Sequence, residues 1–181
     1  DEPVSTFERG LLSVVIPCYN EISVLPLLEE RLMSSLAGIG MPWEVVFVDD
    51  GSRDGSYERL AALGAADPRF KLVRLSRNFG HQAAIAAGLS WARGEAVAIL
   101  DADLQDPPEL IATCLKHWRE GDQVVYCQRE ERKEGPLKRL LYRAFYRVLR
   151  ASAEVAMPLD AGDFCLMDRR VVDVITAMPE H

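Results

Sequence analysis

Residues 96–111 read A-V-A-I-L-D-A-D-L-Q-D-P-P-E-L-I, an apolar run that changes at Asp101 into acidic and helix-starting residues. The apolar part has the length of a buried strand. Asp106 and Pro107, followed by Glu109, have the form of a capping box with proline in the first helical turn. A buried strand that leads directly into a helix is half of a βαβ unit.

The same alternation of short apolar runs and amphipathic stretches extends along the chain. The predicted strands are residues 11–16, 43–48, 71–75, 96–100, 123–127 and 163–167. The predicted helices are residues 25–36 behind a cap at Ser23, 55–66, 80–93, a segment from 107, 135–153 and 171–177. This pattern predicts an α/β fold with a mainly parallel central sheet flanked by helices. Because neither a repeat nor a linker interrupts the pattern, residues 1–181 are predicted to form a single domain.

The composition of the chain limits the number of domains, the kinds of partner and the roles of its cysteines. The chain has 181 residues, of which 49% are hydrophobic and 27% charged, which fits one compact domain. Its net charge of -7 argues against a nucleic-acid partner, because neutralising phosphates needs a basic surface. The cysteines form no C-x-x-C pair and are predicted to be small buried residues of a protein in a reducing compartment. They are Cys18, Cys114, Cys127 and Cys165.

The sequence shows neither a membrane-span pattern nor an export signal. No run approaches the roughly 20 apolar residues of a membrane span, and no signal-peptide pattern is present. The chain begins at Asp1 rather than at methionine. We therefore expect a fragment of a longer protein.

Polar side chains gather where the predicted strands end, and three strands contribute to that edge. They are Tyr19, Asn20 and Glu21 after the first strand, Asp49 and Asp50 after the second, and Asp101, Asp103, Gln105 and Asp106 after the fourth. In an open α/β sheet, ligands bind outside the carboxyl ends of the strands. The convergence therefore predicts a binding site at this edge.

Asp101 and Asp103 have the spacing of a metal site. Strand alternation points two carboxylates two residues apart to the same side, and they repel each other unless a cation lies between them. Mg²⁺ or Mn²⁺ prefers such oxygen ligands and also holds phosphate oxygens. A bare D-x-D pattern is more often a turn or a cap, but here it follows an apolar strand and precedes a helix start, which favours a metal site.

Four other residues each have a structural and a functional interpretation. Asp49 and Asp50 fit a tight turn, or a carboxylate that accepts hydrogen bonds from a base or ribose. Tyr19 fits an amphipathic rim residue, or a platform on which a nucleobase stacks. His81 fits a structural helix-start residue, or a contact to a phosphate.

A basic segment stands out in this acidic chain. Residues 129–150 contain eight basic and three acidic side chains. The predicted amphipathic helix 136–152 carries arginines beside an apolar face, which is typical of a helix lying on an anionic membrane. The alternative is a helix that packs on the sheet with a solvated basic face. Arg129 and Arg132 follow the fifth strand and suit phosphate binding. Asp163 is either a turn residue or, if it is functional, a residue near the acceptor substrate.

Five stretches resemble the family 2 glycosyltransferases of the GT-A fold. More closely, they resemble the polyprenyl-phosphate glycosyltransferases, the group of dolichol-phosphate mannose synthase and the bacterial undecaprenyl-phosphate glucosyltransferases. The matching stretches are V-V-I-P-C-Y-N-E (14–21), V-F-V-D-D-G-S-R-D-G-S (46–56), L-S-R-N-F-G-H-Q-A-A (75–84), A-I-L-D-A-D-L-Q-D-P-P-E-L-I (98–111) and D-A-G-D-F-C-L-M-D-R-R (160–170). They follow in family order along nearly the whole chain.

The resemblance implies an inverting, metal-dependent transfer of a sugar from a nucleotide-sugar, expected to be a UDP-sugar, to a polyprenyl phosphate. The residues expected to bind the nucleotide are Pro17, Tyr19, Glu21, Asp50 and Asp101. Those expected to organise Mg²⁺ or Mn²⁺ are Asp101, Asp103 and Gln105, and those expected to act in catalysis are Asp101, Asp103 and Asp163.

The acceptor side is implied in the same way. Arg129 and Arg132 would face donor or acceptor phosphates, and the enzyme would act at the cytoplasmic face of a membrane. A lipid phosphate is ionised near neutral pH, its second pKa being about 6, so a general base is not required. Cys165 stands where close relatives often carry a basic residue, which puts a phosphate contact there in doubt. Relatives commonly carry transmembrane helices after this region, so the resemblance implies a fragment that lacks the C-terminal membrane segments of its parent protein. Oligomer formation is left open.

Two other functions remain as alternatives. An aspartyl-nucleophile phosphatase also uses D-x-D with Mg²⁺ after an apolar strand, but Leu104 and Gln105 do not fit its pattern. A non-catalytic nucleotide-binding or membrane-targeting module would fit a truncated chain. A dinucleotide-binding oxidoreductase is disfavoured, because the first strand is not followed by G-x-G-x-x-G.

Overall fold

The computed structural model describes residues 7–128 and 161–178. Contacts divide the chain into two compact units, Asp1–Tyr126 with Asp163–His181, and Cys127–Gly162. The predicted basic helix 136–152, together with Arg129 and Arg132, lies outside the described residues.

The described elements alternate as the sequence predicts. The strands are β1 (Glu8–Cys18), β2 (Trp43–Asp49), β3 (Phe70–Arg74), β4 (Gly94–Ile99), β5 (Val124–Gln128) and β6 (Ala161–Asp168). The helices are α1 (Leu25–Ala37), α2 (Ser56–Ala66), α3 (His81–Trp91), α4 (Leu110–Arg119) and α6 (Arg169–Thr176).

The strands form one sheet in the order β3-β2-β1-β4-β6-β5. The pairs β1–β2, β1–β4 and β2–β3 are parallel, whereas β4 and β6 are antiparallel. The prediction of an α/β fold with a mainly parallel sheet is therefore confirmed. The antiparallel strand β6 is the one departure within these four pairs.

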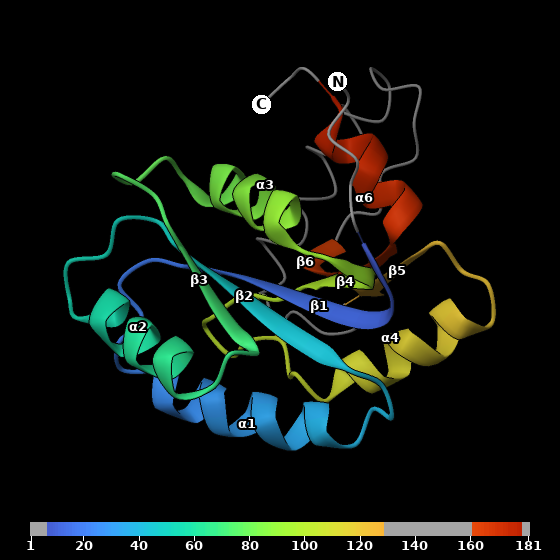
Figure 1. Ribbon diagram of the computed structural model, residues 1–181, viewed down its shortest axis with the longest axis horizontal. Coiled ribbons are helices and arrows are strands. Elements are labelled where there is room, and N and C mark those ends of the chain that lie inside the picture. The colour runs from blue at the N-terminus through green and yellow to red at the C-terminus, as the bar shows by residue number, and fades with distance from the viewer. Residues whose placement is uncertain (1–6, 129–160, 179–181) are drawn as a thin grey trace, which may run out of the picture. The chain divides into compact units, whose positions relative to one another are not determined.

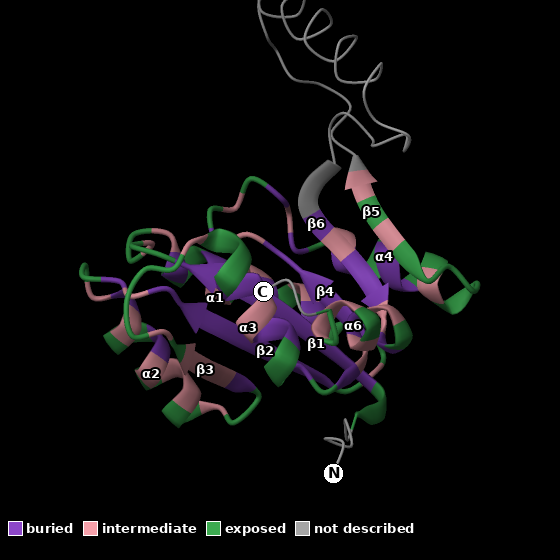
Figure 2. Cartoon of the chain, turned by 90° about the horizontal axis from the view of Figure 1, so that it is seen from above, coloured by how far each residue is buried: buried purple, intermediate pink, exposed green. Residues whose placement is uncertain are grey.

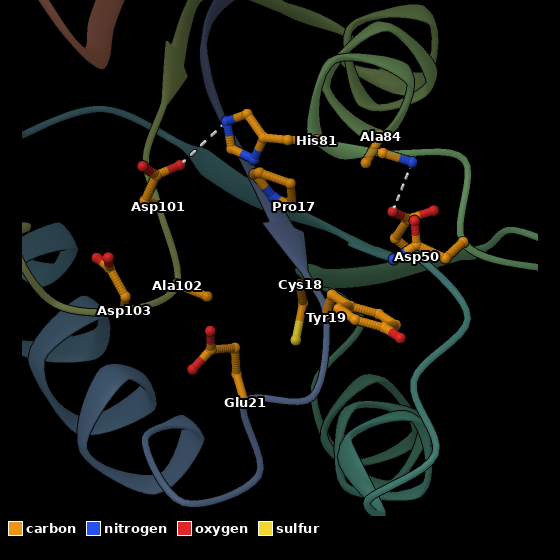
Figure 3. Close-up of a pocket in the computed structure, with 12 residues that line it drawn as sticks. Pro17, Cys18, Tyr19, Glu21, Asp50, His81, Ala84, Asp101, Ala102 and Asp103 are labelled. Carbon is orange, nitrogen blue, oxygen red and sulfur yellow. Dashed lines mark hydrogen bonds and ion pairs between the residues drawn. The ribbon is translucent and has the colours of Figure 1, made fainter.

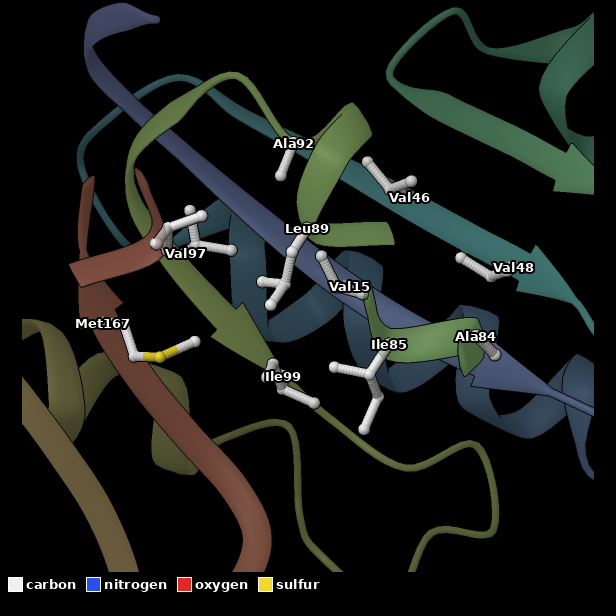
Figure 4. Packing of buried hydrophobic residues seen from close by; sticks show 11 residues of the cluster. Val15, Val46, Val48, Ala84, Ile85, Leu89, Ala92, Val97, Ile99 and Met167 are labelled. Atoms are coloured by element: carbon white, nitrogen blue, oxygen red, sulfur yellow. The ribbon is translucent and has the colours of Figure 1, made fainter. Parts of the chain in front are cut away.

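Helices cover both faces of the sheet: α1, α2 and α4 lie on one face, and α3 and α6 on the other (Figure 1). The central strands β1, β2 and β4 are buried along most of their length (Figure 2). Between α3 and the sheet, Val15, Val48, Ile85 and Leu89 belong to one apolar cluster (Figure 4). This packing fixes the start of α3 over the carboxyl ends of β1 and β2.

The helix caps predicted from sequence are wrong. Helix α1 is preceded by Val24 with no side-chain cap, and Ser23 is exposed. Helix α4 begins at Leu110, three residues later than predicted, because Pro108 disfavours helical geometry in the residue before it. The N–H groups of Leu110 and Ile111 donate to the carbonyls of Pro107 and Pro108, at 3.0 and 3.1 Å. The Glu109 carboxylate accepts hydrogen bonds from Arg31 of α1 instead, at 2.6 and 3.1 Å.

None of the helices in the two described ranges combines the length and the apolar run needed to cross a bilayer.

Candidate functional site

The carboxyl ends of β1, β2 and β4 open onto one pocket of about 320 Å³. Parallel register sets this convergence: Cys18 pairs with Asp49, and the Leu100 N–H donates to the Val15 carbonyl at 3.0 Å. The next residues of each strand therefore reach the same edge. The pocket is lined by Pro17, Cys18, Tyr19, Glu21, Asp50, Asn78, Gly80, His81, Ala84, Asp101, Ala102 and Asp103 (Figure 3).

Two loops that carry lining residues are hydrogen-bonded to each other. The Asn20 N–H donates to Ser52 Oγ at 2.9 Å, and Asn20 Oδ1 accepts from the Arg53 N–H at 2.8 Å. The Glu21 N–H donates to Ser56 Oγ at 2.9 Å. Because the β1–α1 loop is fixed to the β2–α2 loop in this way, Tyr19 and Glu21 are presented to the pocket from a rigid backbone.

The Asp50 side chain holds a third loop, between β3 and α3, at the same edge of the sheet by hydrogen bonds. Its carboxylate, 3% exposed, accepts hydrogen bonds from the N–H groups of Phe79 at 2.8 Å and Gly80 at 3.0 Å. These residues precede α3, so Asp50 determines where that helix begins. The sequence suggested a turn residue or a base contact, and the structure shows a carboxylate that organises the pocket wall.

Gly51 allows this loop to approach closely. Its φ is +75°, and a Cβ at this position would lie 2.8 Å from the Arg77 carbonyl carbon and 2.9 Å from the Asn78 nitrogen. Both are backbone atoms, so relief requires the loop to move. No side chain other than hydrogen therefore fits between the β2–α2 and β3–α3 loops.

We expect Gly51→Ala to lower the free energy of unfolding by about 2–4 kcal/mol, from left-handed strain plus the clash. Chemical denaturation measures this. The matched control is Gly40→Ala, where φ is +70° but no atom lies within 4 Å of the added Cβ, so strain acts alone. Equal losses in the two variants would contradict the close packing of Gly51 on the loop.

Asp101 and Asp103 face the pocket from the end of β4 (Figure 3). His81 Nε2 lies 3.5 Å from Asp101 Oδ1, which joins the first residue of α3 to the D-x-D segment. Asp103 Oδ1 accepts from the Gln105 N–H at 2.9 Å, and Leu104 between them has a φ of +60°. A tight turn therefore holds the Asp103 carboxylate at the pocket mouth.

These two carboxylates suit a hard cation, although the protein alone supplies few ligands. Within residues 7–128 and 161–178, no three His, Cys, Asp or Glu side chains gather closely enough to hold a metal ion. Mg²⁺ commonly binds through one or two carboxylates and completes its shell with water and substrate phosphates. The donor set at Asp101 and Asp103 therefore fits a cation that arrives together with a diphosphate.

The acidic character of the pocket shows in two pKa shifts. Burial raises the pKa of the Glu21 carboxyl above its ordinary value, and the charges of Asp103 and Asp54 raise it further. Burial, with nearby Asp49, Glu21 and Asp54, raises the pKa of the Cys18 thiol to about 12. Cys18 is therefore an inert thiol, as its predicted role as a small buried residue requires.

The raised pKa of Glu21 means that its ionised form opposes folding. This cost is absent well below the ordinary pKa of about 4.3, where the carboxyl is protonated in both states, grows as pH rises from there to the folded-state pKa, and is constant above it. We expect Glu21→Gln to raise the denaturant midpoint at pH 7 in EDTA, and to have no effect near about pH 3, where the carboxyl is protonated in both states. A gain of equal size at both pH values would contradict the electrostatic cause.

The structure gathers most of the predicted donor-site residues and leaves others outside the pocket. Gln105 is exposed, does not line the pocket, and contributes a backbone N–H to Asp103. Asp163 lies in β6. Arg129 and Arg132 lie outside the described residues. The predicted donor-site residues that line the pocket are Pro17, Tyr19, Glu21, Asp50, Asp101 and Asp103.

Sequence reasoning passed over two lining residues of the β3–α3 loop, Asn78 and Gly80. The signal for them was the stretch L-S-R-N-F-G-H-Q-A-A (75–84), which follows a predicted strand but carries no acidic side chain. His81, which the sequence assigned either a structural role or a phosphate contact, also lies in the pocket wall.

The sequence pattern of the family described as Glycosyl transferase family 2 matches residues 13–176. Among curated proteins, the chain is 44% identical over 169 residues to the uncharacterized glycosyltransferase YkcC of Bacillus subtilis, covering 93% of this chain and 52% of the relative. It is 35% identical over 171 residues to the bactoprenol glucosyl transferase of Shigella phage SfV, covering 94% of this chain and 56% of the relative. The chain thus spans about half the length of the curated relatives it matches.

One solved structure that is similar to this chain contains bound ligands. The mannosyltransferase PcManGT from Pyrobaculum calidifontis, in complex with GDP-Man and Mn²⁺, superposes with a TM-score of 0.60 at 28% identity. The match covers 95% of this chain and 48% of that protein.

Proposed function

Since the chain belongs to the family 2 glycosyltransferases, we propose that it is the donor-binding part of an enzyme that moves a sugar from a nucleotide-sugar to a polyprenyl phosphate. The proposal extends over the whole residue range 1–181 as one catalytic domain. Because the chain belongs to this family, it is not the aspartyl-nucleophile phosphatase that the sequence analysis left as an alternative.

One observation carries the proposal: the two D-x-D carboxylates and the aromatic Tyr19 line the same pocket of about 320 Å³. A nucleotide-sugar has an anionic diphosphate at its centre and a flat base at one end. Carboxylates that hold a cation suit the first, and an aromatic ring suits the second. The mannosyltransferase PcManGT, solved with GDP-Man and Mn²⁺, supports this assignment.

In the proposed complex, the base lies toward Tyr19 and Asp50, and the diphosphate lies toward Asp101 and Asp103. Tyr19 is 46% exposed, which leaves its ring face accessible for stacking. Asp50 keeps the N–H groups of Phe79 and Gly80 in place, so the wall beside the base is formed before the ligand arrives. We expect uracil as the base, and guanine is the alternative.

Asp101 and Asp103 would hold Mg²⁺ or Mn²⁺ against the diphosphate. The bound cation supplies Lewis-acid stabilisation of the negative charge that develops on the leaving diphosphate. The turn at Leu104 fixes the Asp103 carboxylate, and Gln105 supports it through its backbone. Holding these oxygens in advance lowers the reorganisation needed during the reaction.

The proposed reaction is a single displacement. A phosphate oxygen of the acceptor forms a bond to the anomeric carbon while the bond from that carbon to the diphosphate oxygen breaks. The leaving nucleoside diphosphate takes the electron pair, and the anomeric carbon inverts. Asp163 and the arginines at 129 and 132 are proposed to orient the acceptor phosphate, which is already ionised near neutral pH.

The acceptor implies a membrane surface. The bactoprenol glucosyl transferase relatives support a lipid acceptor, and the basic stretch 129–150 would bind anionic headgroups through helix 136–152. We propose that the enzyme acts at the cytoplasmic face of a membrane.

A transfer assay tests the proposal. Purified protein is incubated with Mn²⁺, undecaprenyl phosphate in detergent, and radiolabelled UDP-glucose or GDP-mannose, and the lipid fraction is counted. The expected result is a labelled lipid with one of the two donors and none in EDTA. Binding of nucleotide and Mn²⁺ without transfer to any polyprenyl phosphate would favour a non-catalytic module.

A further inference from the structure

Among the lining residues that the structure describes in the donor pocket, the pocket of about 320 Å³, His81 is the one basic residue. The same lining holds four carboxylates, those of Glu21, Asp50, Asp101 and Asp103. The His81 side chain is 41% exposed, so it belongs to the pocket surface rather than to the core. An N–H donor placed among carboxylates that are proposed to hold a cation can orient one of them.

The His81 ring is directed toward one oxygen of the D-x-D segment. His81 Nε2 lies 3.5 Å from Asp101 Oδ1 (Figure 3). Oδ1 is itself buried, whereas the Asp101 side chain as a whole is 24% exposed, so the exposure belongs to its other atoms. The imidazole therefore lies against the enclosed side of the carboxylate and not against its open side.

The backbone that carries the imidazole is fixed. Gly80, the residue before His81, donates its N–H to Asp50 Oδ2 at 3.0 Å. The Gly80 carbonyl accepts from the N–H of Ala84 at 3.1 Å, and Ala84 is fully buried in the apolar cluster between α3 and the sheet. The His81 side chain thus extends from a helix start that is held on both sides.

His81 connects two strand ends that are not neighbours in the sheet. In the order β3-β2-β1-β4-β6-β5, strand β1 separates β2 from β4. Asp50 follows β2 and holds the residue just before His81, and Asp101 follows β4 and lies against the His81 ring. The side of the pocket assigned to the base and the side assigned to the cation are therefore joined through one residue of α3.

We propose that His81 is a positioning residue for the cation: its Nε2–H donates to Asp101 Oδ1 and so directs Asp101 Oδ2 toward the metal ion. Carboxylates that bind metal ions are commonly oriented by hydrogen bonds of this kind, and loss of the partner weakens metal binding by roughly 10–100-fold. The inference rests on the proposed function, because it takes the D-x-D carboxylates as the cation site.

The observed geometry fits such a contact. The 3.5 Å separation is longer than the roughly 2.9 Å of a formed N–H···O bond, and hydrogen bonds at reacting sites commonly shorten when ligand binding draws the groups together. Nε2 carries a proton in one neutral tautomer of imidazole and also in the imidazolium form. The positioning role therefore does not depend on titration of the ring.

A titration with Mn²⁺ alone, followed by electron paramagnetic resonance, tests the inference without any donor. His81→Leu keeps a side chain of similar size but removes the N–H, and we expect it to bind Mn²⁺ about tenfold more weakly. His81→Gln carries an amide N–H at a similar reach and should stay within about threefold of wild type. Denaturant titration checks that both variants fold as wild type does.

The matched control is His117→Leu. His117 is 51% exposed, and its Nδ1 lies 3.7 Å from the carboxylates of Glu120 and Asp122, but it does not line the donor pocket. The control should bind Mn²⁺ as wild type does. An equal loss in His117→Leu and His81→Leu would mean that any histidine near acidic groups has this effect, and would overturn the inference.

Calorimetric titration with UDP, and with GDP as the second probe, at stepped Mn²⁺ concentrations separates positioning from direct contact. If His81 acts through Asp101, His81→Leu needs about tenfold more Mn²⁺ for half-maximal nucleotide binding, and saturating Mn²⁺ restores wild-type affinity by mass action. A loss that persists at saturating Mn²⁺ would identify a direct contact between His81 and the diphosphate, and would overturn the positioning role.

The remaining outcomes also decide the inference. It is overturned if His81→Leu binds Mn²⁺ within about threefold of wild type, if His81→Gln loses as much affinity as His81→Leu, or if wild type binds no Mn²⁺. Nucleotide binding that persists in wild type while the His81 variants show no change would leave the proposed function intact. Mn²⁺ binding that depends on His81, in a protein that binds neither nucleotide, would support the positioning role and contradict the proposed function.

Discussion

Asp103→Asn is expected to lower the rate of sugar transfer by about a thousandfold, because it removes one charge from the cation site while keeping its shape. The amide oxygen of the substituted side chain can still accept the hydrogen bond from the Gln105 N–H, so the turn persists. Asp103 is exposed, and its replacement should leave the unfolding temperature unchanged. Initial rates under saturating Mn²⁺ and donor measure the effect.

The control for this prediction is Asp122→Asn, an equally conservative change at an exposed acid that does not line the pocket of Asp101 and Asp103. It should leave the rate unchanged. A rate for Asp103→Asn within about threefold of wild type would mean that this carboxylate does not hold the cation, since loss of a metal ligand costs far more.

Asp50→Ala is expected to have the second largest effect, on both folding and transfer. It leaves the N–H groups of Phe79 and Gly80 without their acceptor, which should lower the free energy of unfolding by about 2–4 kcal/mol. The start of α3 would shift with these residues, and a displaced pocket wall should slow transfer by roughly a hundredfold. Denaturant titration and initial rates measure the two effects.

Asp50→Asn provides the graded comparison, because it retains one acceptor oxygen and should fall between wild type and the alanine variant. If Asp50→Ala unfolds at the wild-type denaturant concentration, the carboxylate does not organise the loop. In that case a direct contact to the base or ribose, the role implied by family resemblance, would be its main function.

Much of the site follows from strand polarity alone. Apolar runs that end at Pro17, Asp49 and Leu100 predict parallel strands, and parallel strands bring their carboxyl ends to one edge. That reasoning is enough to bring Tyr19 and Asp101 into one pocket before any coordinates are known. It works because buried parallel strands are near-continuous apolar runs whose ends are easily read.

Other features depend on tertiary contacts that local patterns do not carry. The antiparallel pairing of β6 with β4 has no local signal, because an apolar run reads the same in either direction. The start of α4 depends on two consecutive prolines and on a bond from Glu109 to Arg31 of a distant helix. Arg53 and Arg77, from two different loops, line one hollow, although in the sequence each arginine alone resembles an ordinary solvated residue.

The most direct test of the central claim, a metal-dependent nucleotide pocket at the carboxyl edge of the sheet, is calorimetric titration with UDP and GDP. Each nucleotide is added to wild type and to Asp103→Asn, in Mn²⁺ and in EDTA. The account predicts that wild type binds one nucleotide in Mn²⁺, and that EDTA or the substitution removes this binding. A folded wild-type protein that binds neither nucleotide in Mn²⁺, or one that binds equally well in EDTA, would contradict it.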